Sequence, residues 1–301
     1  MNLSISNIAW DASEDEKVYG MMRSLGYTGL EIAPTRIFAD NPYGDLKRVR
    51  KWKDDIYEKY GFVIPSMQSI WYGRQEKLFG SEEERRILTE YTKKAIDFAE
   101  AASCGNLVFG CPKNRAISYE TEDYTRKTED HTKRSEKHTV KTGDNIKKSE
   151  DRHRVQYETC EEIALRFFKM LGEYAFQHHT VIAMEANPKI YNTNFVNTTQ
   201  EAVELVEKVD SKGFLLNLDI GTMLENGETI ETLKGKEKLI NHIHISEPYL
   251  KPIAKRELHR ELAAWLKYID YRGFVSIEAG RQDCGGSDGI RDMMEYVSNV
   301  F

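Results

Sequence analysis

The sequence predicts a single-domain α/β protein, a closed (β/α)8 barrel, on three observations. Short apolar runs alternate strictly with longer amphipathic runs along the chain, and such alternation produces a parallel sheet. Eight strand–helix pairs can be counted, and 301 residues suit one α/β barrel, which typically needs about 250 residues. No Gly-x-Gly-x-x-Gly run follows the first predicted strand, which weighs against an open dinucleotide-binding sheet.

Each predicted strand is a short apolar run bounded by polar residues or glycine. The eight predicted strands are residues 3–8, 28–33, 62–68, 106–109, 180–185, 214–219, 239–245 and 274–278. The helices that alternate with them have apolar residues at helical spacing and recognisable ends. Gly26 and Gly61 each end a helix, and Thr198 or Thr199 is a suitable N-cap. The eight predicted helices are residues 14–25, 45–60, 82–102, 157–178, 199–209, 229–238, 256–269 and 288–300.

Within the single domain, residues 1–301, residues 117–156 form a predicted hydrophilic insertion between strand four and helix four. From Tyr124 the chain repeats every seven residues, with Thr or Ile at the second position and Thr or Ser at the fifth. A seven-residue repeat indicates a coiled coil only when two of its positions are apolar, and here those positions are polar or charged. We therefore expect a solvated excursion, with an ordered accessory element as the alternative. Because loops after barrel strands lie on the face that carries functional sites, a lid is one role for the insertion.

Charge and composition exclude several classes of protein. The net charge is −6 and the pI about 5.9, so we expect no nucleic-acid partner and no anionic membrane surface, both of which need a basic face. No apolar stretch approaches the ~18 residues of a membrane-spanning helix, and no signal peptide is recognisable at the N-terminus. The four cysteines lack paired metal-ligand spacing. We expect a cytoplasmic protein with reduced thiols, and the sequence leaves a homo-oligomer open.

The fifth to eighth predicted strands each end in a side chain that can bind a metal ion. These side chains are Glu185, Asp219, His244 and Glu278. The carboxyl ends of barrel strands converge on one mouth, so side chains far apart in the sequence can meet there. Period-2 alternation directs these four toward the lumen and the residues preceding or following them toward the helices. The outward residues are Met184, Leu218, Ile243 and Ile277.

Three carboxylates and one imidazole around open positions predict a site for one divalent metal ion. Such ligands suit Mn²⁺, Mg²⁺, Co²⁺ or Fe²⁺ better than a closed thiolate zinc site. We take Mn²⁺ as the first choice, with Zn²⁺ as a further alternative. A structural alternative exists for Asp219, which precedes Ile220-Gly221-Thr222 and is placed to cap a turn. An alignment of ligands at four successive strands favours the metal site over four separate structural roles.

These motifs resemble those of the sugar phosphate isomerase/epimerase family, the xylose isomerase-like TIM barrels. The segments that carry the resemblance are Ala-Met-Glu185-Ala-Asn-Pro, Asn-Leu-Asp219-Ile-Gly, His-Ile-His244-Ile-Ser-Glu247 and Ser-Ile-Glu278-Ala-Gly. The resemblance covers nearly the whole chain except the insertion. The members of that family include ketose 3-epimerases, hydroxypyruvate isomerase, inosose dehydratase and AP endonucleases.

The resemblance implies one divalent metal ion held by Glu185, Asp219, His244 and Glu278. It also implies that Glu185 and Glu278 act as acid/base catalysts. A proton α to a carbonyl is too weakly acidic for an unaided carboxylate, and a metal ion stabilises the cis-enediolate that forms. Two carboxylates on opposite faces of a sugar can remove the proton and return it, which gives an epimerase or an isomerase. A dehydratase on the same site and a barrel without catalysis, used for binding or as a scaffold, remain the alternatives.

The chain departs from the ketose epimerase pattern at two places. Thr222 stands where those enzymes usually have His, and no Asn-Arg pair follows Glu247. Lys251 either replaces that arginine as a substrate contact or is a surface charge. The resemblance to AP endonucleases is weaker, because Gln68 ends the third predicted strand where that branch needs one of several further histidines. We therefore expect a carbohydrate substrate.

Six residues near the predicted mouth are candidate substrate contacts: Glu247, Asn187, Gln68, Trp10, Lys251 and Arg281. Each has an alternative structural role. Trp10 follows the first strand and either stacks on a sugar or packs. Asn187 either contacts hydroxyl groups or shapes the turn at Pro188. Glu247 either contacts the substrate or orients His244. Glu31, a weaker candidate, lies on the second predicted strand.

Overall fold

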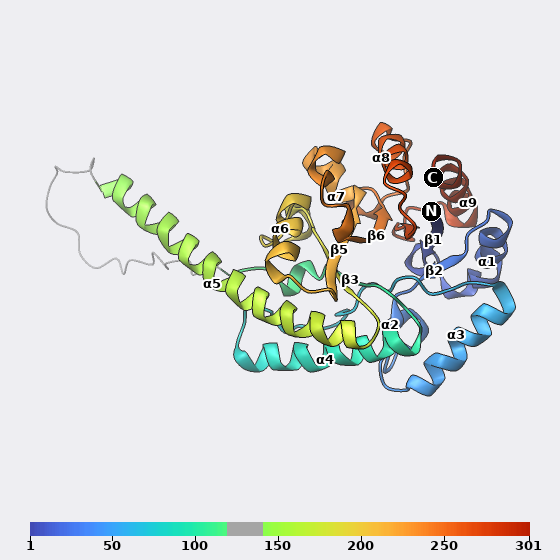
Figure 1. The fold of residues 1–301 in the computed structure, drawn as a ribbon, viewed down its shortest axis with the longest axis horizontal. Coiled ribbons are helices and arrows are strands. Elements are labelled where there is room, and N and C mark those ends of the chain that lie inside the picture. The colour runs from blue at the N-terminus through green and yellow to red at the C-terminus, as the bar shows by residue number, and fades with distance from the viewer. Residues whose placement is uncertain (119–140) are drawn as a thin grey trace, which may run out of the picture.

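The computed structural model describes residues 1–118 and 155–301, together with the backbone of helix α5 from Lys141. Seven parallel strands form one curled sheet in the order β2-β1-β7-β6-β5-β4-β3. The strands are β1 (Asn2–Ser6), β2 (Gly29–Glu31), β3 (Leu107–Phe109), β4 (Ile182–Glu185), β5 (Phe214–Asp219), β6 (Ile240–Ile245) and β7 (Phe274–Ile277). Helices surround the sheet, with the two chain ends close together (Figure 1). The predicted α/β barrel is confirmed.

The barrel closes through residues 62–68, where the sequence predicts the third strand. This segment makes single bridges from Val63 to Gly29 and from Met67 to both Ile32 and Leu107. It therefore joins β2 to β3, the two edges of the sheet. The segment does not form a continuous strand ladder, and the physical reason is Pro65, which has no backbone N–H to donate.

Helix ends follow local chemistry where the sequence indicated them. Ser81 and Glu84 form a capping box at the start of α4 (Glu82–Ala101), and Thr198 forms one at the start of α6 (Thr199–Val209). Gly61 ends α3 (Leu46–Tyr60) with φ 78°, a left-handed conformation that costs glycine little. The remaining helices are α1 (Asp15–Ser24), α2 (Pro34–Ile37), α5 (Lys141–Gln177), α7 (Ile220–Asn226), α8 (Glu257–Tyr268) and α9 (Gly286–Val300).

Two predicted helices differ from the structure. The prediction for 229–238 is wrong: α7 comes earlier, directly after β5, and two 3₁₀ turns follow it, at Ile230–Leu233 and Glu237–Leu239. Gly227 ends α7 with φ 66°, and Gly235, with φ 79°, separates the two turns. Helix α5 begins at Lys141, so part of the predicted insertion continues the fourth helix. The preceding repeats, 119–140, lie outside the described residues, and the domain boundaries stay a prediction.

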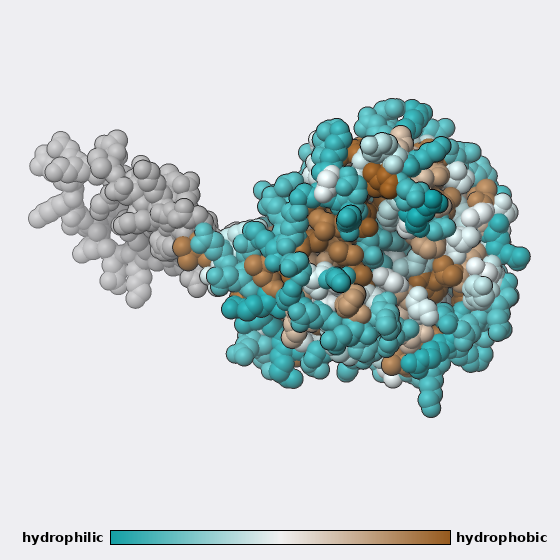
Figure 2. All heavy atoms as spheres, viewed as in Figure 1, coloured by the Kyte–Doolittle hydropathy of each residue, from teal (hydrophilic) through white to brown (hydrophobic). Residues whose placement is uncertain are grey.

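The apolar core lies between the sheet and the helices. The four strand residues predicted to face outward, Met184, Leu218, Ile243 and Ile277, are all buried in this core. The lumen is polar near its mouth, with Ser6, Glu31, Asn217 and both strand histidines buried there. The view in Figure 2 shows a largely hydrophilic surface on the barrel body, with hydrophobic residues in its recessed centre. None of the helices in the described residues has the length and apolar character that crossing a bilayer requires.

Candidate metal centre

Glu185, Asp219, His244 and Glu278 meet at the mouth of the barrel. Each offers one ligand atom, and these atoms all lie within 4.8 Å of one another. The parallel register explains the meeting, because Asp219 pairs with His244 across β5 and β6, and Glu185 pairs with Asn217 across β4 and β5. Glu278 directly follows β7, which pairs with β6. The structure thus brings together the four residues that the sequence predicted as ligands from their places at strand ends.

The geometry around His244 fits a metal ligand better than a hydrogen-bonded histidine. Its Nδ1 lies 2.9 Å from Glu185 Oε1 and 3.3 Å from Glu278 Oε2. This nitrogen is buried, yet it makes no hydrogen bond to any described residue. A buried polar atom without a partner is costly, and here it faces several carboxylates. A neutral imidazole and three carboxylates are the donors that Mn²⁺ and similar divalent cations take, so the residues present fit the ion.

The other edge of the His244 ring is held by Glu31. His244 Nε2 lies 2.9 Å from Glu31 Oε2 in hydrogen-bonding geometry. His242 Nε2 lies 3.1 Å from the same oxygen, and Gln68 donates to Glu31 Oε1 at 3.2 Å. A histidine that binds a metal through one nitrogen commonly donates its other N–H to a carboxylate, which fixes the tautomer. Glu31 therefore orients His244; its lumen-facing place at a strand end was the signal in the sequence.

Charge and burial shift the pKa values of the centre. Burial, followed by the charges of Glu185 and Glu278, raises the pKa of Asp219 to about 7. Burial also raises the pKa of Glu278. Burial opposes protonation of His244, but the charges of Glu31 and Glu278 outweigh it and raise the pKa of the ring well above its ordinary value. Crowded carboxylates that resist ionisation are what a divalent cation would stabilise.

Neighbouring side chains fix the carboxylates. Glu185 accepts hydrogen bonds from Asn217 Nδ2 at 2.7 Å and from Asn187 Nδ2 at 3.2 Å. Asp219 accepts a hydrogen bond from the Thr222 backbone N–H at 2.6 Å and another from the Ser246 hydroxyl. The capping role that the sequence offered as an alternative is therefore real, and it coexists with the place of Asp219 in the ligand cluster.

Arg115 was missed by the sequence analysis, because it stands in an irregular loop after β3. Its guanidinium is fully buried and donates to the carbonyl oxygens of Gly110, Val196 and Glu185. It also donates to Asn187 Oδ1 at 2.8 Å, and Asn187 in turn donates to Glu185. Burial lowers the pKa of Arg115 to about 10, so the group remains cationic at neutral pH. Arg115 thus holds the loop that carries Glu185 and Asn187.

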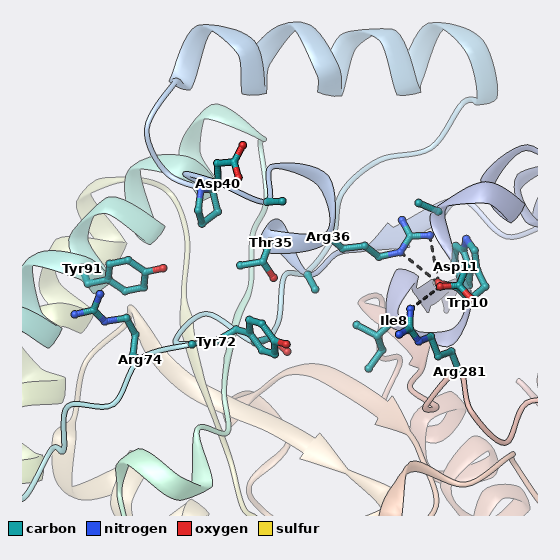
Figure 3. Close-up of a pocket in the computed structure, with 16 residues that line it drawn as sticks. Ile8, Trp10, Asp11, Thr35, Arg36, Asp40, Tyr72, Arg74, Tyr91 and Arg281 are labelled. Carbon is teal, nitrogen blue, oxygen red and sulfur yellow. Dashed lines mark hydrogen bonds and ion pairs between the residues drawn. The ribbon is translucent and has the colours of Figure 1, made fainter.

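The six candidate substrate contacts lie in different places. Asn187 and Gln68 contact the centre through Glu185 and Glu31, as described above. Glu247 contacts neither His244 nor the ligand cluster by hydrogen bond or ion pair in the described residues; Arg256 Nη2 lies 2.6 Å from its Oε2. Lys251 is exposed, with its Nζ 5.7 Å from the Tyr249 ring centroid. Trp10 and Arg281 line a cavity beside the centre (Figure 3).

The place of Glu31 predicts an effect on metal affinity. Glu31→Gln keeps the size of the side chain but removes the charge that His244 and His242 face. We expect Mn²⁺ affinity to fall by about 10–100-fold, the usual cost of losing such a partner. Calorimetric titration of the metal-free protein with Mn²⁺ measures it. Glu58→Gln on the exposed face of α3 is the matched control, and equal affinities for the two variants would contradict the role of Glu31.

Comparison with known proteins agrees with the fold. The model of the xylose isomerase-like TIM barrel family matches residues 21–300. No curated protein matches the chain by sequence. Among solved structures, 3-keto-D-glucoside 4-epimerase from E. coli is similar with a TM-score of 0.71 and 16 % identity, covering 99 % of each chain.

Two further solved structures show the same fold. D-psicose 3-epimerase from Clostridium cellulolyticum H10 has a TM-score of 0.67 and 16 % identity, covering 100 % of this chain and 96 % of its own. A probable 3-DHS dehydratase from Bacillus anthracis has a TM-score of 0.62 and 15 % identity, covering 100 % of this chain and 98 % of its own. Because the family model matches nearly the whole length of this chain, the chain belongs to the xylose isomerase-like TIM barrel family.

Proposed function

We propose that this protein is a metal-dependent isomerase or epimerase that acts on a sugar or sugar derivative. The observation that carries the proposal is the cluster of Glu185, Asp219, Glu278 and Nδ1 of His244, a buried nitrogen without a hydrogen bond, within 4.8 Å at the barrel mouth. Family membership and the likeness to two sugar epimerases support it. In this proposal one divalent ion, Mn²⁺ before Mg²⁺, Co²⁺, Fe²⁺ or Zn²⁺, is held by all four residues.

The two glutamates are assigned the proton transfers. Glu185 and Glu278 come from β4 and β7, and β5 and β6 lie between these strands. They therefore approach a substrate at the mouth from two sides, as removal of a proton on one face and its return on the other require. When bound, a divalent cation would stabilise the negative charge on the oxygens of an enediolate. Asp219 and His244 serve as ligands only.

The surroundings of the two glutamates suggest which one removes the proton and which one returns it. Glu185 accepts hydrogen bonds from two amide groups, which hold the carboxylate in place to accept a proton. The raised pKa of Glu278 favours the protonated form, as a general acid requires. Glu185 would then remove the proton and Glu278 return it, for the substrate orientation in which the reacting C–H faces β4.

The test is metal-dependent exchange of a carbon-bound proton with solvent. The metal-stripped protein is reloaded with Mn²⁺ and incubated in D₂O with ketoses, aldoses and their phosphates, and NMR follows deuterium incorporation. We expect incorporation only with metal present. The absence of exchange in every sugar, with one ion bound per chain, would refute the proposal.

A dehydratase on the same site is the second candidate. It is supported by the shared ligand cluster and by the fold likeness to the probable 3-DHS dehydratase. The same proton abstraction would then be followed by loss of a hydroxyl group from the β carbon. Analysis of the products separates the two activities. A dehydratase yields an unsaturated product that absorbs in the ultraviolet. An epimerase assayed in H₂O yields a sugar of the same mass as the substrate.

The raised pKa of Asp219 predicts how pH affects the metal-free protein. A carboxyl whose folded pKa is raised from 3.8 to about 7 stabilises the fold below its ordinary pKa and loses that contribution as pH rises through 7. His244, whose pKa is also raised, acts in the same direction. We therefore expect Mn²⁺ to raise the melting temperature more at pH 8 than at pH 5.5, because protons no longer compete for the ligands. Equal increases at both pH values would contradict this.

A further inference from the structure

A cavity lies on the same face of the barrel as the candidate metal centre but over the opposite half. It has a volume of about 820 Å³ and is lined by residues from the loops after β1, β2, the 62–68 segment and β7. The four ligands of the centre come instead from β4 to β7. Cavities of about 300–1,000 Å³ hold drug-sized ligands, so this one has more space than one sugar ring fills. The mouth therefore has a reacting half and a second, open half.

The pairing of β1 with β7 brings one wall of the cavity near the strand that precedes Glu278. Ile5 pairs with Ile277, so the chain leaving β1 runs beside the chain that carries Glu278. Three residues after Glu278, Arg281 lines the cavity, and its Nη1 lies 2.5 Å from Asp11 Oδ1 on the loop after β1. Figure 3 shows this pair beside Ile8 and Trp10 on one side of the cavity. A substituent on a sugar at the centre would extend toward the cavity along this wall.

The charges of the cavity disfavour an anionic ligand. Each of its three arginines is paired with a carboxylate: Arg281 with Asp11, Arg36 with Asp15, and Arg74 with Glu76. Asp40 adds a fourth carboxylate, which has neither a hydrogen bond nor an ion pair among the described residues. Asp15 and Glu76 lie outside the lining of the cavity, but each arginine is already paired with a carboxylate, so none is left unpaired to bind a phosphate.

The same groups suit a neutral ligand with many hydroxyl groups. Paired guanidinium and carboxylate groups keep unused donors and lone pairs that hydroxyls can meet. Tyr72 adds an aromatic surface: it is 71 % exposed, and its ring packs on no other ring or cation in the part of the chain that is described. Figure 3 places Tyr72 and Thr35 between the Arg281 wall and the Arg74–Tyr91 pair. An exposed tyrosine beside polar groups is a surface on which the apolar face of a sugar ring can stack.

We infer that this cavity is a second carbohydrate subsite, so that the substrate is a glycoside whose reacting sugar lies at the centre and whose second glycosyl unit lies over Tyr72. The inference rests on the proposed function for the reacting sugar. It adds a substrate class: a neutral glycoside, in preference to a free or phosphorylated monosaccharide.

The test compares one reacting sugar with and without a second ring. Calorimetry with the Mn²⁺-loaded protein measures binding of D-fructose, of its neutral glycosides isomaltulose, lactulose and turanose, and of D-fructose 6-phosphate. We expect at least one glycoside to bind about tenfold more tightly than D-fructose, the gain from one well-stacked ring. No gain for any glycoside overturns the inference, and so does a larger gain for the phosphate.

Two variants test whether the higher affinity for glycosides depends on the cavity. Ala39 lines the cavity and is exposed, so Ala39→Trp fills the space, and Tyr72→Ala removes the stacking surface. In both we expect the ratio of glycoside to D-fructose affinity to fall from about tenfold to about one. Tyr268→Ala is the control, because Tyr268 is 86 % exposed on α8 and lies outside the cavity. An unchanged ratio in Ala39→Trp overturns the subsite, and thermal melts confirm that each variant is folded.

The two proposals fail in different ways. If no sugar exchanges deuterium but glycosides still bind in a manner that Ala39→Trp abolishes, the catalytic proposal is wrong and the subsite stands. If D-fructose and its glycosides exchange deuterium equally and Ala39→Trp changes neither, the catalytic proposal stands and the subsite is wrong.

Discussion

Glu185→Gln and Glu278→Gln should each lower the rate of solvent deuterium exchange by about 10²–10⁴-fold, the usual contribution of a positioned acid or base. Each substitution keeps the shape of the side chain and removes the group that carries the proton. Both side chains lie within 3.3 Å of His244 Nδ1, so each loss is expected at the place where the proton transfer is proposed.

Metal content must be measured in the same samples, because both glutamates are also proposed ligands. A variant that keeps about one Mn²⁺ per chain but loses exchange supports the acid/base role. A variant that loses the ion and the exchange together supports only the ligand role. Glu58→Gln on α3, whose side chain is exposed, should match the unmodified protein in both measurements. Exchange at the unmodified rate in both active-site variants would refute the mechanism.

Arg115→Met should lower the free energy of unfolding by about 3–5 kcal/mol, because it breaks a buried hydrogen-bond network of several acceptors. The substitution removes the Arg115 donor from the carbonyl oxygens of Gly110, Val196 and Glu185 and from the Asn187 side chain. The Val196 oxygen keeps the Asn187 backbone N–H as a donor, and each group left unsatisfied costs about 1–3 kcal/mol. Because Asn187 contacts Glu185, we also expect the folded variant to catalyse deuterium incorporation into the sugar more slowly.

Urea unfolding of the metal-free protein measures the change. Arg50→Met on α3 is the matched control, since Arg50 is exposed and such substitutions usually change stability by less than about 0.5 kcal/mol. A loss below about 1 kcal/mol for Arg115→Met would show that the loop is held by other contacts. Arg115→Lys should recover part of the stability, because an ammonium group can reach some but not all of the acceptors.

Regular patterns in the sequence predicted the parts of the structure that depend on periodicity. The alternation in β5 and β6 identified both the lumen-facing ligands and the outward Leu218 and Ile243, and convergence of strand ends brought Asp219 and His244 together. The exception among the strands is 62–68, where the apolar run hid the effect of Pro65 on strand pairing. The helix at 229–238 failed for a related reason, because Gly235 interrupts an otherwise helical composition.

Contacts between loops could not be predicted from periodic patterns in the sequence. Nothing in the sequence places Arg115 against the Glu185 carbonyl, because the contact joins residues far apart in the chain and carries no period. Glu31 was recognisable as an acidic residue on a strand. Its contact with His244 could not be predicted, because it depends on the curvature of the sheet that brings β2 opposite β6. Glu247, three residues after His244, illustrates the converse: it is close in sequence but pairs with Arg256.

The unequal pairing of the strands gives the two halves of the mouth different stiffness. Ladders of several residues join β4 through β7 and also join β7 to β1 and β1 to β2, whereas single bridges at 62–68 join β2 to β3. Backbone amides near Val63 and Met67 should therefore exchange with solvent faster than those of β5 and β6. The strands that carry the candidate metal ligands are thus firmly paired, whereas the 62–68 segment on the cavity side is the weakly paired part of the barrel. Ligand preference can thus change over evolutionary time on one side of the barrel without altering the metal chemistry on the other.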